Sequence, residues 1–362
     1  MDGQINSTLE LVNSTSGFDV NSLASTVVKT ILYSILLLLS SIGNTLVIII
    51  VYRDETLRSN VDIFIVNMAV SDLLIPVFAI PKRIYELYMD TIWLVGGHFG
   101  SFLCKFFPFA ENIANMVSVL TLVMIAVERF YSVVLPIYKP PVTKTNRLWF
   151  VVASWFLPIG AFSHLFFSWK LKLDTNGRHC QYSWGFQAWK IEFYVFFSFV
   201  IALPLFLIAF LYSTVIISLQ RRKRKLNLAN EQRKRREKRN RKIVFLLLLL
   251  VTVFILSWTP YSIFIFLYLF QPALILHSVH YKRMYFAALF SSLAFTAINP
   301  CLYYVFSKNY KRGLHKCLTY LIPFHCDCFV GSANEGELVM NRAEIEMARQ
   351  RASTVRFTDL GV

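Results

Sequence analysis

Four polar residues interrupt long apolar stretches of the chain: Asn44, Asp72, Ser118 and Asn299. Polar groups in such surroundings are costly, so they are candidates for a function. One carboxylate among neutral donors can bind a small cation, or it can exchange a proton as helices repack. The same residues can equally form a hydrogen-bonded core that only holds helices together. The residues alone leave both interpretations open.

Two acidic residues share one apolar stretch with an arginine. Glu128 directly precedes Arg129, and in isolation this is an ordinary ion pair at a helix end. Glu111 precedes Arg129 by 18 residues, about five helical turns, so both lie near one helix face. A carboxylate at that depth needs a partner. The partner can be a basic residue of another helix or a cationic ligand, and the sequence does not decide between them.

Two prolines fall inside apolar helical stretches, Pro260 after Trp258-Thr259 and Pro300 after Asn299. Proline removes a backbone hydrogen bond and kinks a helix. We therefore expect hinge points at both positions. In contrast, the sequence contains no phosphate-binding loop, no zinc-protease motif and no nucleophile elbow, so we predict neither an enzyme nor a cofactor.

The elements that must position these residues are membrane-spanning helices. Of the 362 residues, 56% are hydrophobic and only 16% are charged, which is too apolar for an ordinary soluble domain. About 20 apolar residues are needed to cross a bilayer as a helix. Seven stretches qualify: Val27–Tyr52, Val61–Tyr88, Ser101–Ser132, Asn146–Ser168, Lys190–Leu219, Ile243–Phe270 and Arg283–Phe306. We predict an all-α membrane protein, a seven-transmembrane helix bundle, over residues 27–306.

The distribution of basic residues predicts the orientation. With the N-terminus outside, ten of the 37 lysines and arginines are extracellular and the remaining 27 are cytoplasmic. Two glycosylation triplets, at Asn6 and Asn13, fall in the extracellular tail 1–26. The net charge of +16 is therefore a membrane asymmetry, and no folded basic domain is left to bind nucleic acid. We expect a multi-pass plasma-membrane protein.

Residues after the seventh stretch predict a membrane-surface helix and a tail. Residues 307–317 are typical of a short amphipathic eighth helix, and Cys317 is a palmitoylation candidate. Residues 318–362 read as a flexible cytoplasmic tail, in which Arg349–Thr354 suits a basophilic kinase and hence arrestin recruitment. The basic segment Arg221–Lys242 suits anionic lipid of the inner leaflet as well as acidic protein surfaces.

Together these residues resemble the rhodopsin-like (class A) G-protein-coupled receptors over about residues 27–317. The matching motifs follow in family order: Gly43-Asn44, Asn67 to Asp72, Cys104, Glu128-Arg129-Phe130, Trp155, Pro204 with Tyr212, Phe254 with Trp258 and Pro260, and Asn299-Pro300 with Tyr303.

The resemblance implies a role for each matched position. Cys104 and Cys180 are expected to form a disulfide, and the other four cysteines to be free. Arg129 resembles the arginine that its acidic neighbour Glu128 restrains and that meets a heterotrimeric G protein on activation. Trp258 resembles the rotamer-sensitive floor of the ligand cavity. The remaining switch and contact residues that the resemblance implies are Asp72, Pro204, Tyr212, Phe254, Pro260, Asn299, Pro300 and Tyr303, with Pro136 and Ile137 as a G-protein contact.

The sequence departs from the family pattern at several positions. Asn240 replaces an acid that in some relatives faces the arginine, so we predict appreciable basal signalling. The resemblance implies sodium at Asp72, Ser118 and Asn299, but Phe295 replaces a polar residue often found there and puts that site in doubt. Leu293 stands where visual pigments carry their retinal-binding lysine, which argues against a photoreceptor.

The sequence is compatible with two classes of ligand, biogenic amines and short neuropeptides. Biogenic-amine receptors pair an acid at the position of Glu111 with the ligand's ammonium, and this remains the alternative reading. However, the face Phe193–Phe199 is almost entirely aromatic, and residues 170–182 suit a hairpin with an Asn176-Gly177 turn, as in neuropeptide receptors. We therefore favour a short neuropeptide, basic or amidated, over an amine, and either receptor over a transporter or channel. The expected ligand contacts are Glu111, Asn112, Asn115, Trp258, Tyr261 and Glu192.

Overall fold

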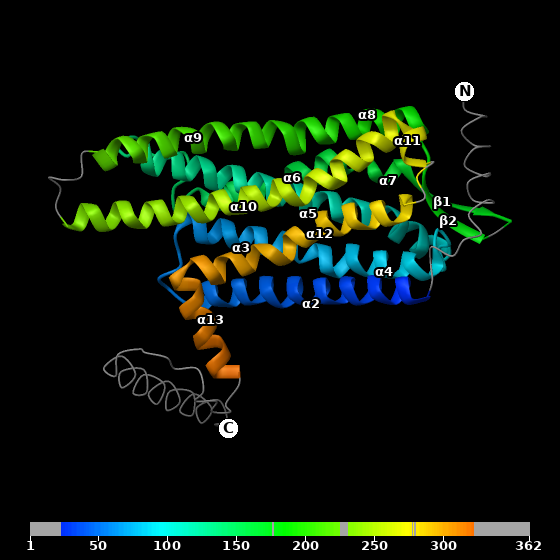
Figure 1. The fold of residues 1–362 in the computed structure, drawn as a ribbon, viewed down its shortest axis with the longest axis horizontal. Coiled ribbons are helices and arrows are strands. Elements are labelled where there is room, and N and C mark those ends of the chain that lie inside the picture. The colour runs from blue at the N-terminus through cyan, green and yellow to red at the C-terminus, as the bar shows by residue number, and fades with distance from the viewer. Residues whose placement is uncertain (1–22, 176, 225–230, 277, 279, 322–362) are drawn as a thin grey trace, which may run out of the picture. The chain divides into compact units, whose positions relative to one another are not determined.

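The computed structural model describes residues 23–175, 177–224, 231–276, 278 and 280–321 (Figure 1). The predicted glycosylation sites at Asn6 and Asn13 lie outside these residues. So do the tail after residue 321 and Cys326 and Cys328.

Seven helical segments among the described residues are long and apolar enough to cross a membrane. Several are interrupted by turns, so the spans comprise the following elements: α2 (Leu23–Arg53); α3 (Asn60–Asp72), η1 (Ile75–Ala79) and α4 (Ile80–Met89); α5 (Gly97–Val133); α6 (Arg147–Phe162) and α7 (Leu165–Ser168); α8 (Phe186–Phe196), η2 (Phe197–Ala202) and α9 (Leu203–Arg224); α10 (Glu231–Phe270); and α12 (Tyr281–Phe306). A short helix, α11 (Pro272–Leu276), joins the last two. The predicted seven-helix fold is confirmed.

The helix ends differ from the prediction at the first span and at the basic segment. The first span begins at Leu23, four residues before Val27. At the basic segment 221–242, α9 continues to Arg224 and α10 begins at Glu231. Lysine, arginine, glutamate and glutamine are good helix formers, which explains why helices extend beyond the apolar stretches that hydropathy detects.

α5 lies at the centre of the bundle, where it contacts α3, α6 and α9, and α12 packs against α10 and α2. Large apolar side chains also cover the outside of the bundle, as at Leu38, Ile42, Phe206 and Phe210. An apolar exterior of this kind suits hydrocarbon rather than water, and helices satisfy their backbone hydrogen bonds internally there.

Two π-helical turns accompany prolines. The backbone N–H of Ile80 donates to the carbonyl of Ile75 at the end of η1, directly before Pro81. Similarly, η2 ends at Ala202, two residues before Pro204. Proline has no N–H for the regular helical bond, so the local register widens by one residue. A π-helical turn changes the rotation of the helical segment that follows it relative to the segment before it.

A β-hairpin covers one end of the bundle, which we call the hairpin end. Strand β1 (Trp169–Asp174) pairs antiparallel with β2 (Gly177–Tyr182), from Trp169 opposite Tyr182 to Asp174 opposite Gly177. Gly177 has φ +131°, a region that favours glycine. A disulfide between Cys104 and Cys180 ties β2 to α5, as the resemblance implied. The predicted hairpin is confirmed.

Helix α13 (Lys308–Leu321) follows α12 and extends four residues beyond the predicted 307–317. Tyr310 and Gly313 form its buried face in the first two turns, whereas Lys311 and Arg312 are exposed. The helix is therefore amphipathic, as predicted. Cys301 and Cys317 are free thiols, also as predicted, and from Lys316 onward the chain forms a separate unit.

Candidate functional site

Glu111 on α5 is paired with a basic residue of a neighbouring helix. The guanidinium nitrogen Nη2 of Arg83, on α4, lies 3.2 Å from Oε1 and 3.1 Å from Oε2 of Glu111. The two side chains are 12% and 17% exposed, so the pair is largely withdrawn from solvent. Of the two partners that the sequence left open, the structure supplies the basic residue.

This pair belongs to a group of four charges, which we call the charged quartet: Lys82, Arg83, Glu86 and Glu111. Nη1 of Arg83 lies 3.0 Å from Glu86, and the ammonium of Lys82 lies 3.5 Å from the same carboxylate. Two cations and two anions give the quartet no net charge. Because a buried charge without a partner is costly, this balance explains how four ionisable groups are tolerated near the hairpin end.

Aromatic side chains continue from the quartet toward α10. Tyr261 and Tyr285 pack against the same buried clusters. Trp258 lies 6.0 Å from Tyr261, centroid to centroid, and 6.2 Å from Phe196. The structure therefore places Trp258 next to Tyr261, and Tyr261 lies within the electrostatic range of Arg83 and Glu111.

Among the other predicted ligand contacts, Asn112 and Glu192 interact with other residues of the bundle. Asn112 donates its side-chain N–H to the carbonyl of Pro108 in its own helix at 2.8 Å. Glu192 on α8 faces His164 at 3.5 Å, at the junction of α6 and α7. Asn115 is half-buried on α5. Arg83 and Lys82 were not predicted as site residues. Arg83 precedes Glu86 by three residues and Lys82 precedes it by four, and this spacing indicates ion pairs along a helix.

The polar core that the sequence predicted forms around Asp72. Ser118 donates to Oδ1 of Asp72 at 2.7 Å, and Asn299 donates to Oδ2 at 2.8 Å. These bonds join α3, α5 and α12 through one carboxylate. Asn44 belongs to a neighbouring network instead, in which it donates to the carbonyls of Ser40 and Thr296, both at 2.9 Å.

The motif residues at the opposite end are also buried. Arg129 forms an ion pair with Glu128 and is 8% exposed. Tyr212 and Tyr303 are almost fully buried, and the Tyr303 ring lies 5.6 Å from that of Tyr310. Just beyond α5, Pro136 and Ile137 are exposed, and Ile137 is 94% accessible. Both side chains are therefore accessible, as the expected G-protein contact requires.

An aromatic cluster of α10 and α12 lies between the two ends. Phe254 lies 5.9 Å from Trp258 and 5.1 Å from Phe295, which packs edge-on against it. Pro204 and Val119 are buried as well. Phe295 therefore contributes an apolar surface to the α10–α12 contact, consistent with its departure from the family's polar residue.

A model of the seven-transmembrane receptors of the rhodopsin family matches residues 43–303 of this chain, which is most of its length. The chain belongs to the rhodopsin family of seven-transmembrane receptors. It is therefore a multi-pass membrane protein and a receptor rather than an enzyme.

The chain is similar to several curated receptors. It is 30% identical over 176 residues to a QRFP-like peptide receptor of Branchiostoma floridae, which covers 47% of this chain and 45% of that protein. It is 28% identical over 292 residues to the probable G-protein coupled receptor 19 of Mus musculus, covering 78% and 66%. Neuropeptide FF receptor 2 of Mus musculus is 29% identical over 298 residues, covering 78% and 70%. The chain thus spans about half to two thirds of the first relatives' lengths.

Proposed function

We propose that this receptor binds a short extracellular peptide and activates heterotrimeric G proteins through an outward movement of α10. The Arg83–Glu111 ion pair is the observation that favours a peptide over an amine as the ligand. An ammonium ligand needs a free carboxylate, but both oxygens of Glu111 already accept from Arg83. Such a ligand would have to displace a buried guanidinium and leave it unpaired, which is costly.

The hairpin and the relatives support a peptide as well. A β-hairpin fixed by the Cys104–Cys180 disulfide provides exposed strand edges and side chains for an extended ligand. Two of the similar receptors are named for peptides, QRFP-like peptide and neuropeptide FF.

The hairpin end is proposed to face the outside of the cell, and the opposite end the cytoplasm. The excess of lysine and arginine on the opposite side supports this orientation. It also places the disulfide in the oxidising compartment, where such bonds persist. Asn6 and Asn13 then become available for glycosylation, and the plasma membrane is the site of action.

Activation is proposed to begin where the ligand contacts Trp258 and Tyr261. Repacking of Trp258 against Phe254 loosens the contact of α10 with α5 and with Pro204 of α9. Pro260 and Pro300 provide kinks at which α10 and α12 can bend. Release of Arg129 from Glu128 then lets Tyr212 and Tyr303 close around it, and opens a groove for the G protein next to Pro136 and Ile137.

Further partners follow from the same arrangement. Arrestin and receptor kinases are proposed to act on the C-terminal tail, and palmitoylation of Cys317 to hold α13 on inner-leaflet lipid. Sodium at Asp72 would need ligands beyond Ser118 and Asn299, and the apolar Phe295 does not supply one.

The test is a functional screen. Cells expressing the receptor are exposed to a library of short amidated peptides and to the biogenic amines, with calcium and cyclic AMP as readouts and an Arg129→Ala variant as control. We expect a peptide to activate the wild type but not the control. Activation by an amine alone would contradict the peptide assignment. Substrate flux or ion current in reconstituted vesicles without G protein would contradict the receptor mechanism.

A further inference from the structure

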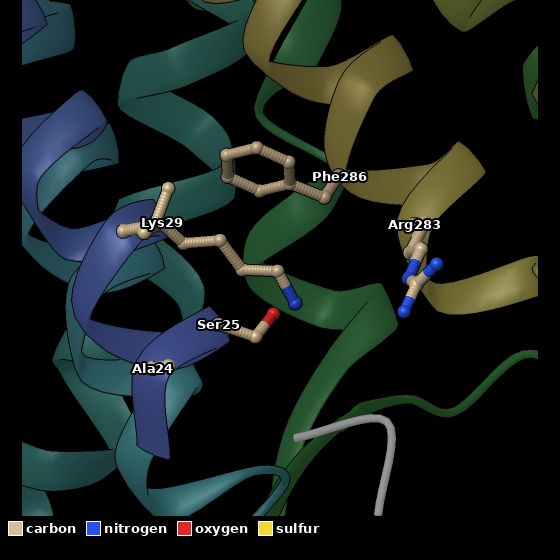
Figure 2. Close-up of a pocket in the computed structure, with 6 residues that line it drawn as sticks. Ala24, Ser25, Lys29, Arg283 and Phe286 are labelled. Carbon is tan, nitrogen blue, oxygen red and sulfur yellow. The ribbon is translucent and has the colours of Figure 1, made fainter. Parts of the chain in front are cut away.

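A cavity between the hairpin ends of α2 and α12 belongs to none of the sites above. Its volume is about 340 Å³, and it is lined by Ala24, Ser25, Val28, Lys29, Arg283 and Phe286. Figure 2 shows the Lys29 side chain running from α2 toward the side of the cavity that Phe286 and Arg283 of α12 border. We call it the α2–α12 cavity.

Most of the Lys29 side chain is buried, and its ammonium borders this cavity. The residue is 8% exposed, and the ammonium lies 5.6 Å from the centroid of the Phe286 ring. Among the described residues no acid forms an ion pair with it, and the neighbouring charges are those of Lys282 and Arg283, both of the same sign. Three cations without an acid between them repel one another and attract an anion.

The helix ends add to this positive potential. α12 begins at Tyr281, so Lys282 and Arg283 lie in its first turn, which contains no acid. The amino end of a helix carries a partial positive charge and favours anions, whereas basic residues there are unfavourable. Leu23, the first described residue of α2, lies only six residues before Lys29, so a second helix directs its positive end to the same place.

Aromatic contacts join the lining of this cavity to the core near the charged quartet. The Phe286 ring lies 5.3 Å from that of Tyr33, which it meets edge-on. Tyr33 in turn lies in the buried cluster against which Tyr261 and Tyr285 pack. A charge bound at Phe286 therefore lies next to the aromatic core that also contains Tyr261.

We propose that the α2–α12 cavity binds the carboxylate of an acidic side chain of the peptide ligand, an inference that rests on the proposed peptide-receptor function. Lys29 and Arg283 supply the positive charges. Val28 and Phe286 pack against the methylene groups of the aspartate or glutamate. Because the charged quartet is neutral, this cavity is the part of the ligand region that selects for ligand charge, and it selects an anion.

Matched peptide pairs test the proposal in cells. Each pair differs by aspartate against asparagine, or glutamate against glutamine, at one position of a peptide that activates the receptor. The wild type is expected to prefer the acidic member by about tenfold or more, the effect of one charged hydrogen bond. Lys29→Met and Arg283→Gln should abolish that preference. Lys170→Gln, which removes an exposed lysine of β1, should leave it unchanged.

Two outcomes of this assay overturn the proposal. One is a wild type without preference for any acidic member, or a preference that survives in the Lys29→Met, Arg283→Gln double variant. The other concerns Asp19, an acid of this chain that lies four residues before Leu23. If Asp19→Asn creates an acidic preference that the wild type lacks, the chain's own carboxylate fills the cavity.

A binding measurement without signalling separates this proposal from the proposed function. The receptor is placed in neutral phosphatidylcholine nanodiscs, which exclude anionic lipid, and its lysines are labelled as ¹³C-dimethylamines. The Lys29 resonance, identified by its loss in Lys29→Arg, should shift on titration with N-acetylaspartate amide and not with N-acetylasparagine amide. A shift with both or with neither overturns the cavity assignment. If no peptide activates the receptor, the function fails while this titration still decides whether the cavity binds a carboxylate.

Discussion

Arg83 of α4 holds both carboxylate oxygens of Glu111 of α5 through a single guanidinium nitrogen, at 3.2 and 3.1 Å. The contact joins two helices near the hairpin end. It also neutralises the charge of Glu111, so this carboxylate is not free to pair with the cationic group of a ligand.

A double-mutant cycle tests this pair. Arg83→Gln or Glu111→Gln alone leaves one buried charge without its main partner, so each should destabilise the receptor by about 3 kcal/mol. The double variant should be less destabilised than the sum of the two. Thermal unfolding of the purified receptor in one detergent measures this. Arg58→Gln is the control, since Arg58 and Glu55 are 57% and 81% exposed and their pair should contribute little. Strict additivity at Arg83 and Glu111 would contradict the pairing.

Gly43 lies against Pro300, and a β-carbon placed on Gly43 would come within 2.6 Å of the proline Cγ. Gly43→Ala should therefore force α2 and α12 apart and destabilise the receptor by about 1–3 kcal/mol. Gly160→Ala is the matched control, because nothing lies within 4 Å of a β-carbon there. In that helix alanine should be neutral or slightly stabilising. Equal melting temperatures for both variants would refute the close approach.

Ser118 donates a buried hydrogen bond to Asp72. Ser118→Ala removes it and leaves a carboxylate oxygen with one partner fewer, which should lower stability by about 1–3 kcal/mol. Ser213→Ala serves as control, because that exposed hydroxyl donates only to the carbonyl of Ala209 in its own helix. The melting temperature should fall for the first variant and stay within error for the second. A reversed order would show that the Asp72 core does not hold the helices.

Glu128 is the acid that pairs with Arg129, and Asn240 offers no second acid from α10. We expect measurable signalling without ligand, an increase of several-fold in Glu128→Gln, and a decrease in Asn240→Glu. Basal cyclic AMP and calcium at matched surface expression measure this. Wild-type activity indistinguishable from that of untransfected cells would contradict the prediction.

The helices and the motif residues could be predicted from the sequence, because hydropathy and local spacing determine them. The spans ended within a few residues of their predicted bounds except where Arg224 and Glu231 continue helices beyond the apolar stretches. The meeting of Asp72 with Asn299 was also predicted, since both are polar groups buried in helices that the family places together.

Contacts between charged residues on different helices could not be predicted in the same way. Arg83 and Glu111 are 28 residues apart on separate helices, and nothing in their local sequence determines that they meet. From the sequence, Lys29 was only one of the ten basic residues predicted to be extracellular. Hydropathy does not show on which face of α2 its side chain lies. Asn44 was predicted to group with Asp72. In the structure the Asn44 side chain instead donates to the carbonyl of Ser40, one turn earlier in α2.

The proposed outward movement of α10 is the central step of activation, and it can be measured as the distance between the Phe245 end of α10 and α6. Spin labels at Trp149→Cys and Phe245→Cys, both exposed positions, report that distance by pulsed electron resonance after the free cysteines are replaced. With an activating peptide, we expect a distance longer by several ångström and a matching rise in G-protein activation. G-protein activation by the peptide with an unchanged distance distribution would contradict it.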